Sequence, residues 1–182
     1  MLVDGQSTLA LELLANQKLI EQLVEWARKT PDMVGVNSES SRLMAWLIKN
    51  GYRSNGKETN LEPLKIFSGI EGTVDTLVKM LLSAHLVMQN EALMALTLIV
   101  CNLIELKDQL SSSFIESNLG QTLVDFILRI SEMERTSNEI VENLNTLVSV
   151  LERLEMVKKH LSEHNIDEKL KIFPRIQQLA TL

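Results

Sequence analysis

The sequence contains few of the residues on which disulfide-rich and sheet-rich folds depend. Its 182 residues include 1 cysteine, 3 prolines and 7 glycines, and only 4% are aromatic. The lone cysteine, Cys101, can form no internal disulfide, and the scarcity of turn-forming and aromatic residues argues against a β-sandwich or a β-barrel. Leucine, in contrast, occurs 32 times. This balance favours a helical protein with enough apolar residues for a sizeable core.

Long apolar runs and clusters of positive charge are also missing. The longest apolar stretch, residues 92–104, is interrupted by Thr97 and Asn102 and is shorter than the roughly 20 residues that cross a bilayer. The amino-terminal residues lack the basic region of a signal peptide, and the net charge of −6 is spread over both halves of the chain. We therefore expect no nucleic-acid binding, no direct membrane insertion, a cytosolic location and a buried thiol at Cys101.

Apolar residues recur at the i, i+3, i+4 spacing of an amphipathic helix through most of the chain. Pro31, Pro63 and Pro174 fall at or near the ends of these segments, where proline is tolerated. Residues 50–60 are rich in Gly and Asn and predict a loop. The pattern predicts helices at residues 6–15, 17–29, 38–50, 61–70, 73–83, 87–106, 109–117, 120–132, 137–161 and 166–180.

The helical segments also repeat along the chain. Residues 76–78 recur at 122–124, residues 96, 99 and 100 match 144, 147 and 148, and residues 43–45 recur at 93–95. Asn16, Gly72 and Asn118, which tolerate the left-handed conformation, precede the middle helix of each unit. A three-helix unit of about 40–47 residues is typical of armadillo repeats. Such units stack and share a core. We therefore expect an all-α, armadillo-type right-handed helical solenoid of about three to four repeats, at residues 6–60, 61–108, 109–161 and, in part, 162–182; a plain helical bundle is the alternative.

No pattern for catalysis is present in the sequence. It lacks phosphate-binding glycine loops and nucleophile motifs. His160 and His164 have a spacing that can bind a metal ion, but their neighbours are charged, and a solvated helix face explains them better. We expect no enzyme, no cofactor and no metal site, and an enzyme or metal protein using these two histidines is the remaining alternative.

Two blocks of residues carry a resemblance to a known family. The first comprises Trp26-Ala27-Arg28, Pro31-Asp32, Gly35-Val36, Glu39-Ser40, Arg42-Leu43 and Leu47-Ile48; the second comprises Ser83, His85, residues 88–93 with the sequence MQNEAL, Ala95-Leu96 and Leu98-Ile99. Together they resemble the C-terminal armadillo repeats of the smg GDS-type GDP dissociation stimulators of small GTPases. The resemblance covers residues 8–105 well and the rest in repeat pattern only.

The resemblance implies an armadillo solenoid that binds Rho-, Rap- and Ras-like GTPases with basic, prenylated tails, promotes GDP release and escorts them between cytosol and membrane. Family members are several times longer, so this chain is expected to be a fragment or short form. Its exposed ends could drive self-association. An armadillo scaffold without a GTPase role is the alternative. Ile48, Leu98 and Thr146 stand where armadillo proteins usually carry a peptide-binding asparagine, which argues against generic peptide binding.

The third helices of a solenoid line its concave surface, where a partner is expected to bind. Aligning the repeats places Met44, Met94 and Glu142 at equivalent positions, with Ser41, Glu91 and Glu139 one turn earlier. Asn90 also lies on this stripe, although it can equally begin its helix. The predicted partner-binding residues are therefore Ser41, Met44, Asn90, Glu91, Met94, Glu139 and Glu142.

Overall fold

A computed structural model describes residues 5–29, 36–53, 59–133, 137–171 and 173, and these residues form α-helices and one 3-10 helix but no strand. The all-α prediction is confirmed. In chain order the helices are α1 (Gly5–Leu14), α2 (Gln17–Arg28), α3 (Val36–Tyr52), α4 (Glu62–Ser68), α5 (Thr73–Met80), α6 (Leu86–Asn102), the 3-10 helix η1 (Ile104–Leu106), α7 (Lys107–Glu116), α8 (Leu119–Ser131), α9 (Asn138–Leu151), α10 (Glu155–Glu163) and α11 (Ile166–Leu170).

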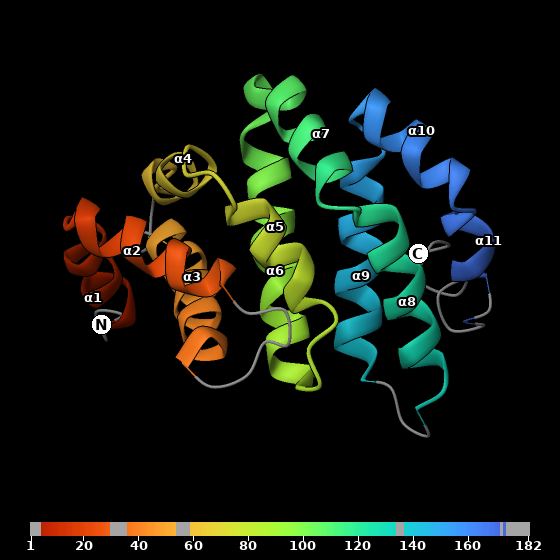
Figure 1. Cartoon of the computed structure of the whole chain (residues 1–182), viewed down its shortest axis with the longest axis horizontal. Helices are drawn as coiled ribbons and strands as arrows, with labels where there is room; N and C mark the ends of the chain where they lie inside the picture. Colours follow the sequence, from red (N-terminus) through yellow and green to blue (C-terminus); the bar gives the residue numbers. More distant parts are fainter. Residues whose placement is uncertain (1–4, 30–35, 54–58, 134–136, 172, 174–182) are drawn as a thin grey trace.

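The helices form a row from α1 at one end to α11 at the other (Figure 1). In chain order, the row consists of similar units: α1 to α3, α4 to α6, α7 to α9, and a last unit of α10 and α11. In this view α2, α5 and α8 form a front layer, and α3, α6 and α9 lie in the layer behind. Within each layer, each helix contacts the next in that order. Buried apolar residues of all units belong to one core cluster that extends from Ala10 to Leu170. Each unit therefore completes the core of its neighbour, as stacked helical repeats do.

Three turns between helices use a residue in the left-handed conformation. The φ angle is 89° at Gly72 before α5, 55° at Asn118 before α8 and 53° at Asn165 before α11. Glycine and asparagine adopt this conformation at the lowest cost. Gly72 and Asn118 are corners, as the sequence predicts. Asn16 differs, because its φ is −98° and its side chain caps α2 by accepting a hydrogen bond from the Leu19 amide.

One predicted helix, at residues 137–161, is two helices in the structure. α9 ends at Leu151 and α10 begins at Glu155. Leu154 between them is 1% exposed, so the apolar spacing continues through the break and conceals it. The arrangement of a helix, a left-handed asparagine and a second helix occurs twice: as α7, Asn118 and α8, and again as α10, Asn165 and α11. Pro31, Pro174 and most of the last predicted helix lie outside the described residues.

The apolar neighbours of Trp26 in the sequence predict a core position, but its side chain is 41% exposed on α2. Its equivalents are Met80 on α5 and Phe126 on α8, and both are 0% exposed. The three residues lie on one stripe of each front-layer helix. We attribute the difference to coverage by the preceding front-layer helix. α2 contacts α5, which carries Met80, and α5 contacts α8, which carries Phe126. Within the described residues, no front-layer helix precedes α2.

Polar contacts supplement the core between units. Arg129 of α8 donates hydrogen bonds to the backbone carbonyls of Leu82 and Ser83, just after the end of α5. Carbonyls at a helix carboxyl terminus carry partial negative charge, so a guanidinium there is stabilising. Arg28 of α2 also pairs with Glu71 at 3.3 Å. That pair is largely exposed and contributes little.

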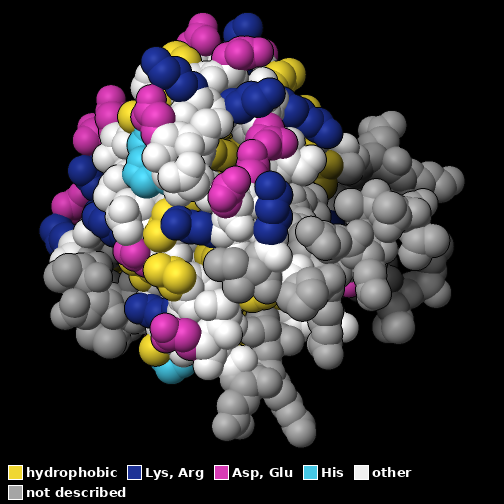
Figure 2. Space-filling model, turned by 90° about the vertical axis from the view of Figure 1, so that its right-hand side faces the viewer, with side chains coloured by type: hydrophobic (Ala, Val, Ile, Leu, Met, Phe, Trp, Pro, Cys, Tyr) yellow, Lys and Arg dark blue, Asp and Glu magenta, His cyan; other side chains and the backbone are white. Residues whose placement is uncertain are grey.

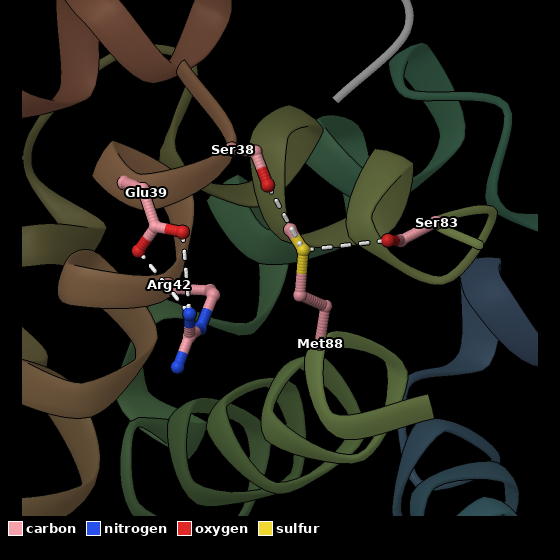
Figure 3. A network of polar contacts seen from close by, with 5 residues as sticks. All are labelled: Ser38, Glu39, Arg42, Ser83 and Met88. Carbon is pink, nitrogen blue, oxygen red and sulfur yellow. Dashed lines mark hydrogen bonds and ion pairs between the residues drawn. The ribbon is translucent and has the colours of Figure 1, made fainter. Parts of the chain in front are cut away.

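A buried thioether joins α3, the end of α5 and α6 (Figure 3). The sulfur of Met88 accepts hydrogen bonds from Ser38 Oγ at 3.2 Å and Ser83 Oγ at 3.3 Å. Met88 is 1% exposed, and Ser38 and Ser83 are 8% and 4% exposed. Gln89 adds a hydrogen bond to the Ser83 carbonyl at 2.7 Å. This methionine therefore supplies an acceptor as well as apolar volume.

Replacing Met88 with leucine is expected to lower the free energy of unfolding by about 1–3 kcal/mol, because two buried hydroxyls lose their acceptor. Met80→Leu is the matched control, since Met80 is 0% exposed and its sulfur accepts no hydrogen bond within the described part of the chain. A swap of such similar volume usually costs less than about 1.5 kcal/mol. Urea titration of both variants measures the difference, and an equal loss in the two would contradict the role of the sulfur.

No single helix among the described residues is long and apolar enough to span a membrane. α6 reaches the required length and composition only together with residues 104–116, and the two segments are bent by 86°. Cys101, near the end of α6, is exposed rather than buried. Cys101 lies on the same face of α6 as Met94 and Thr97. The apolar run around it in the sequence gives no sign that this face is exposed.

Candidate protein-binding face

The seven residues predicted to bind a partner do not share one surface. Ser41 and Met44 are each 0% exposed and point into the core. On α6, Asn90, Glu91 and Met94 are half-buried, and on α9, Glu139 and Glu142 are exposed. Five of the predicted residues thus lie on the open side of the rear layer, and the two from α3 do not.

The burial of the two α3 residues reflects the register between repeats. The sequence match of residues 43–45 with 93–95 sets α3 and α6 50 residues apart, whereas the burial pattern of the helices agrees at 48. At that offset the outward positions 39, 42, 43, 46, 49 and 53 correspond to 87, 90, 91, 94, 97 and 101. The same offset relates α6 to α9. Leu43 and Trp46 are therefore the α3 counterparts of Glu91 and Met94.

We refer to the corrected surface as the third-helix face. It comprises three positions on each rear-layer helix: Arg42, Leu43 and Trp46 on α3; Asn90, Glu91 and Met94 on α6; and Asn138, Glu139 and Glu142 on α9. Sequence reasoning missed Arg42, Leu43 and Trp46. The signal that could have found them was the 48-residue offset already present between α6 and α9.

Side chains bridge the helices of the third-helix face. Lys49 Nζ of α3 lies 2.6 Å from Glu91 Oε1 of α6, and the two side chains are 19% and 20% exposed. On the other side of α6, Asn90 donates to Glu139 at 2.8 Å and accepts from Asn143 at 2.7 Å. Glu91 and Glu139 are thus already engaged within the protein. Their carboxylates help to align α3, α6 and α9.

At the α1 end, this face contains a cleft of about 350 Å³. Its lining consists of Leu9, Leu13, Glu39, Arg42, Leu43, Trp46 and Glu91. Leu9 is 49% exposed and Leu43 is 38% exposed. Glu39 and Arg42 pair at 3.2 Å beside them (Figure 3). An apolar patch with aromatic and arginine residues and a polar rim is typical of protein–protein interfaces.

The α9 end of the face is acidic. Glu142 is exposed, and its carboxylate forms no ion pair with any residue that the structure describes. Glu139 beside it is also exposed, although it accepts the hydrogen bond from Asn90. The third-helix face therefore changes from apolar at α1 and α3 to acidic at α9. Such a face suits a partner with both apolar and basic groups.

The two histidines of the metal hypothesis are engaged in protein contacts. Their rings lie 4.6 Å apart between centroids. His160 Nε2 accepts a hydrogen bond from the Gly120 amide at 3.3 Å, and His164 Nδ1 lies 2.9 Å from the His160 carbonyl oxygen. Among the described residues, no group of three or more His, Cys, Asp or Glu side chains is arranged to hold a metal ion.

Comparison with known proteins identifies relatives that are similar to the chain in sequence. No family model matches the chain, and no solved structure matches it. The chain is 38% identical over 210 aligned positions to the GTPase-GDP dissociation stimulator vimar of Drosophila melanogaster. The alignment covers all of this chain and 33% of that relative. It is 34% identical over 163 positions to the Rap1 GTPase-GDP dissociation stimulator 1-B of Xenopus laevis, which covers 90% of the chain and 24% of that relative. The 1-A form from the same species is 35% identical over 81% of the chain.

The chain spans only about a quarter to a third of the length of these relatives. The aligned region nevertheless extends past residues 8–105, where the motifs are concentrated, to the whole chain. The resemblance to the smg GDS-type GDP dissociation stimulators that the motifs indicated is thereby confirmed, and the chain is a homologue of part of these proteins.

Proposed function

We propose that the chain is a portion of an armadillo-type solenoid that binds a small GTPase of the Rho, Rap or Ras type through the third-helix face and stimulates release of GDP. The observation that carries this proposal is the similarity of the entire chain to proteins named as GTPase-GDP dissociation stimulators. The row of helical units with one continuous core supports the solenoid arrangement. A cytosolic location without membrane insertion fits the same role.

Stimulation of this kind needs a binding surface rather than a catalytic side chain. If the third-helix face binds the nucleotide-free GTPase more tightly than the GDP form, GDP affinity falls by the same factor, because coupling between two ligands is reciprocal. A tenfold preference corresponds to about 1.4 kcal/mol, which a few contacts at a cleft such as that around Trp46 can supply. The acidic α9 end adds attraction for basic groups, and that attraction weakens at high salt.

Release of a fluorescent GDP analogue from purified Rho-, Rap- and Ras-type GTPases tests the proposal. With this chain in excess, we expect at least one GTPase to lose the nucleotide about tenfold faster, and its nucleotide-free form to bind about tenfold more tightly than its GDP form. Binding without faster release would show that exchange depends on more of the protein than this chain contains. Absence of binding in every nucleotide state would instead favour an interaction scaffold without a GTPase role.

The scaffold remains the second candidate function, and one observation favours it. The negative charge of Glu91, one of the acidic residues on the third-helix face, is balanced by Lys49. The face therefore offers less free negative charge than its sequence indicates, and its apolar cleft suits protein partners of many kinds. Self-association through the exposed side chain of Trp26 is a further proposal for the isolated chain.

A further inference from the structure

The last unit of the row is attached to the preceding one through an unusual contact at the amino terminus of α8. The first amide groups of a helix have no partner within the helix. In α8 the residue before the helix, Asn118, makes no side-chain cap. The Gly120 amide instead donates to Nε2 of His160, which belongs to α10, at 3.3 Å. One side chain of the last unit thus satisfies a backbone donor of the unit before it.

The surroundings of this contact are tightly packed. Gly120 is buried, and a methyl group added to it would meet the ring of His164. The His164 ring lies edge-on to the His160 ring, at an interplanar angle of 61°. α10 and α11 both contact α8, and α10 also contacts α7. Leu161, Ile166 and Leu170 are buried at these contacts, with exposures of 4%, 1% and 9%.

The hydrogen bond exists in only one protonation state of His160. A neutral imidazole can accept at Nε2 when its proton is on Nδ1, whereas an imidazolium has no acceptor. Protonation would also place a positive charge at the helix terminus that already carries partial positive charge. The contact is therefore lost and replaced by repulsion when the ring is charged.

We propose that neutral His160 serves as the cap of α8, so that α10 and α11 stay docked on α8 near neutral pH and loosen when acidification protonates the imidazole. This device is independent of the proposed function. It makes one end of the row sensitive to pH, while the third-helix face around Trp46 lies at the other end. Figure 2 shows the α10 and α11 end of the row, where charged side chains of both signs are interspersed and apolar patches are small.

The charges around His160 agree with this direction. Burial and the neighbouring His164 lower the pKa of His160, and Glu163 partly offsets them. The acids on the helices packed against α10 include Glu116 on α7, Asp125 on α8 and Asp167 on α11, and all three are exposed. Since the pKa of His160 is lower in the folded protein than its usual 6.5, the stabilisation is complete above about pH 6.5 and is lost as the pH falls through the folded-state pKa.

Hydrogen exchange of the intact chain at about pH 7.5 and about pH 5.5, corrected for the intrinsic rates, tests the proposal on either side of the ordinary histidine pKa. In the wild type we expect amides of α10, α11 and the first turn of α8 to lose protection several-fold at the lower pH, relative to α2 and α3. His160→Gln keeps an acceptor that does not titrate, and its protection is expected to change by less than about twofold. His85→Gln is the matched control, because His85 is exposed at the start of α6, and this variant is expected to retain the wild-type response.

A second measurement keeps the proposal testable if His160→Gln does not fold. Nitrogen-15 NMR of the wild-type imidazole near neutral pH should show Nε2 without a proton and Nδ1 with one. A proton on Nε2 would overturn the proposal, since that nitrogen could not accept from Gly120. An unchanged pH response in folded His160→Gln would overturn it as well.

Discussion

Leu43→Glu is expected to weaken binding of a small GTPase by about 10- to 100-fold, the effect of losing a central apolar contact of an interface. Leu43 is 38% exposed in the cleft beside Trp46, so a carboxylate reaches water in the free chain and the fold is retained. In the complex it would be buried beside Glu39 and Glu91, which are also acidic. Titration of the nucleotide-free GTPase at constant salt measures the change in Kd.

The matched control for this variant is Leu128→Glu. Leu128 is 45% exposed, but it lies on α8 in the front layer, away from the third-helix face. The same change of side chain there should leave the Kd within about twofold, as surface changes outside an interface do. Equal affinity of both variants and the wild type would exclude the cleft as the binding site. Equal loss in both would indicate a nonspecific effect of added negative charge.

Gly72→Ala is expected to lower the free energy of unfolding by about 1–3 kcal/mol. Gly72 has φ of 89° before α5, and a methyl group there would meet the Arg28 side chain. An L-residue with a Cβ is strained in this conformation. Displacement of Arg28 also removes its pairing with Glu71. Urea unfolding followed by circular dichroism measures the loss.

Two further variants separate the causes of that loss. Gly69→Ala is three residues away at φ of −79°, where alanine fits, and it should be neutral or stabilising by up to about 1 kcal/mol. Gly72→Asn introduces the residue that forms the equivalent corners at positions 118 and 165. Because asparagine tolerates the left-handed conformation, its loss should be smaller than that of Gly72→Ala. Equal losses in the two would assign the cost to Arg28 rather than to the backbone.

The helices and two of the corners could be predicted because they depend on residues close in sequence. Apolar spacing identifies a helix, and a glycine or asparagine between two helices marks Gly72 and Asn118 as turns. The break between α9 and α10 was missed for the same reason. Leu151, Leu154 and Val157 are all buried, so the local pattern stays helical across the turn.

The α3 part of the third-helix face could not be predicted from the sequence because short matches do not set the register. A shift of two residues turns a helix by about 200°, from the open side to the core. The match of residues 43–45 with 93–95 carries that error and predicts Ser41 and Met44 at the positions that Leu43 and Trp46 occupy. Two other features depend on contacts between distant segments, which no local pattern encodes. These are the exposure of Trp26 and the bond from Gly120 to His160.

Both tryptophans of the chain lie in the first unit, Trp26 on α2 and Trp46 on α3. Their emission therefore reports on one end of the molecule, whereas far-ultraviolet circular dichroism averages over every helix. In a row whose units contact mainly their neighbours, the two signals need not follow the same transition. The degree to which their unfolding curves coincide measures how cooperatively the row melts. The placement of two side chains thus provides an optical probe confined to one end of the protein.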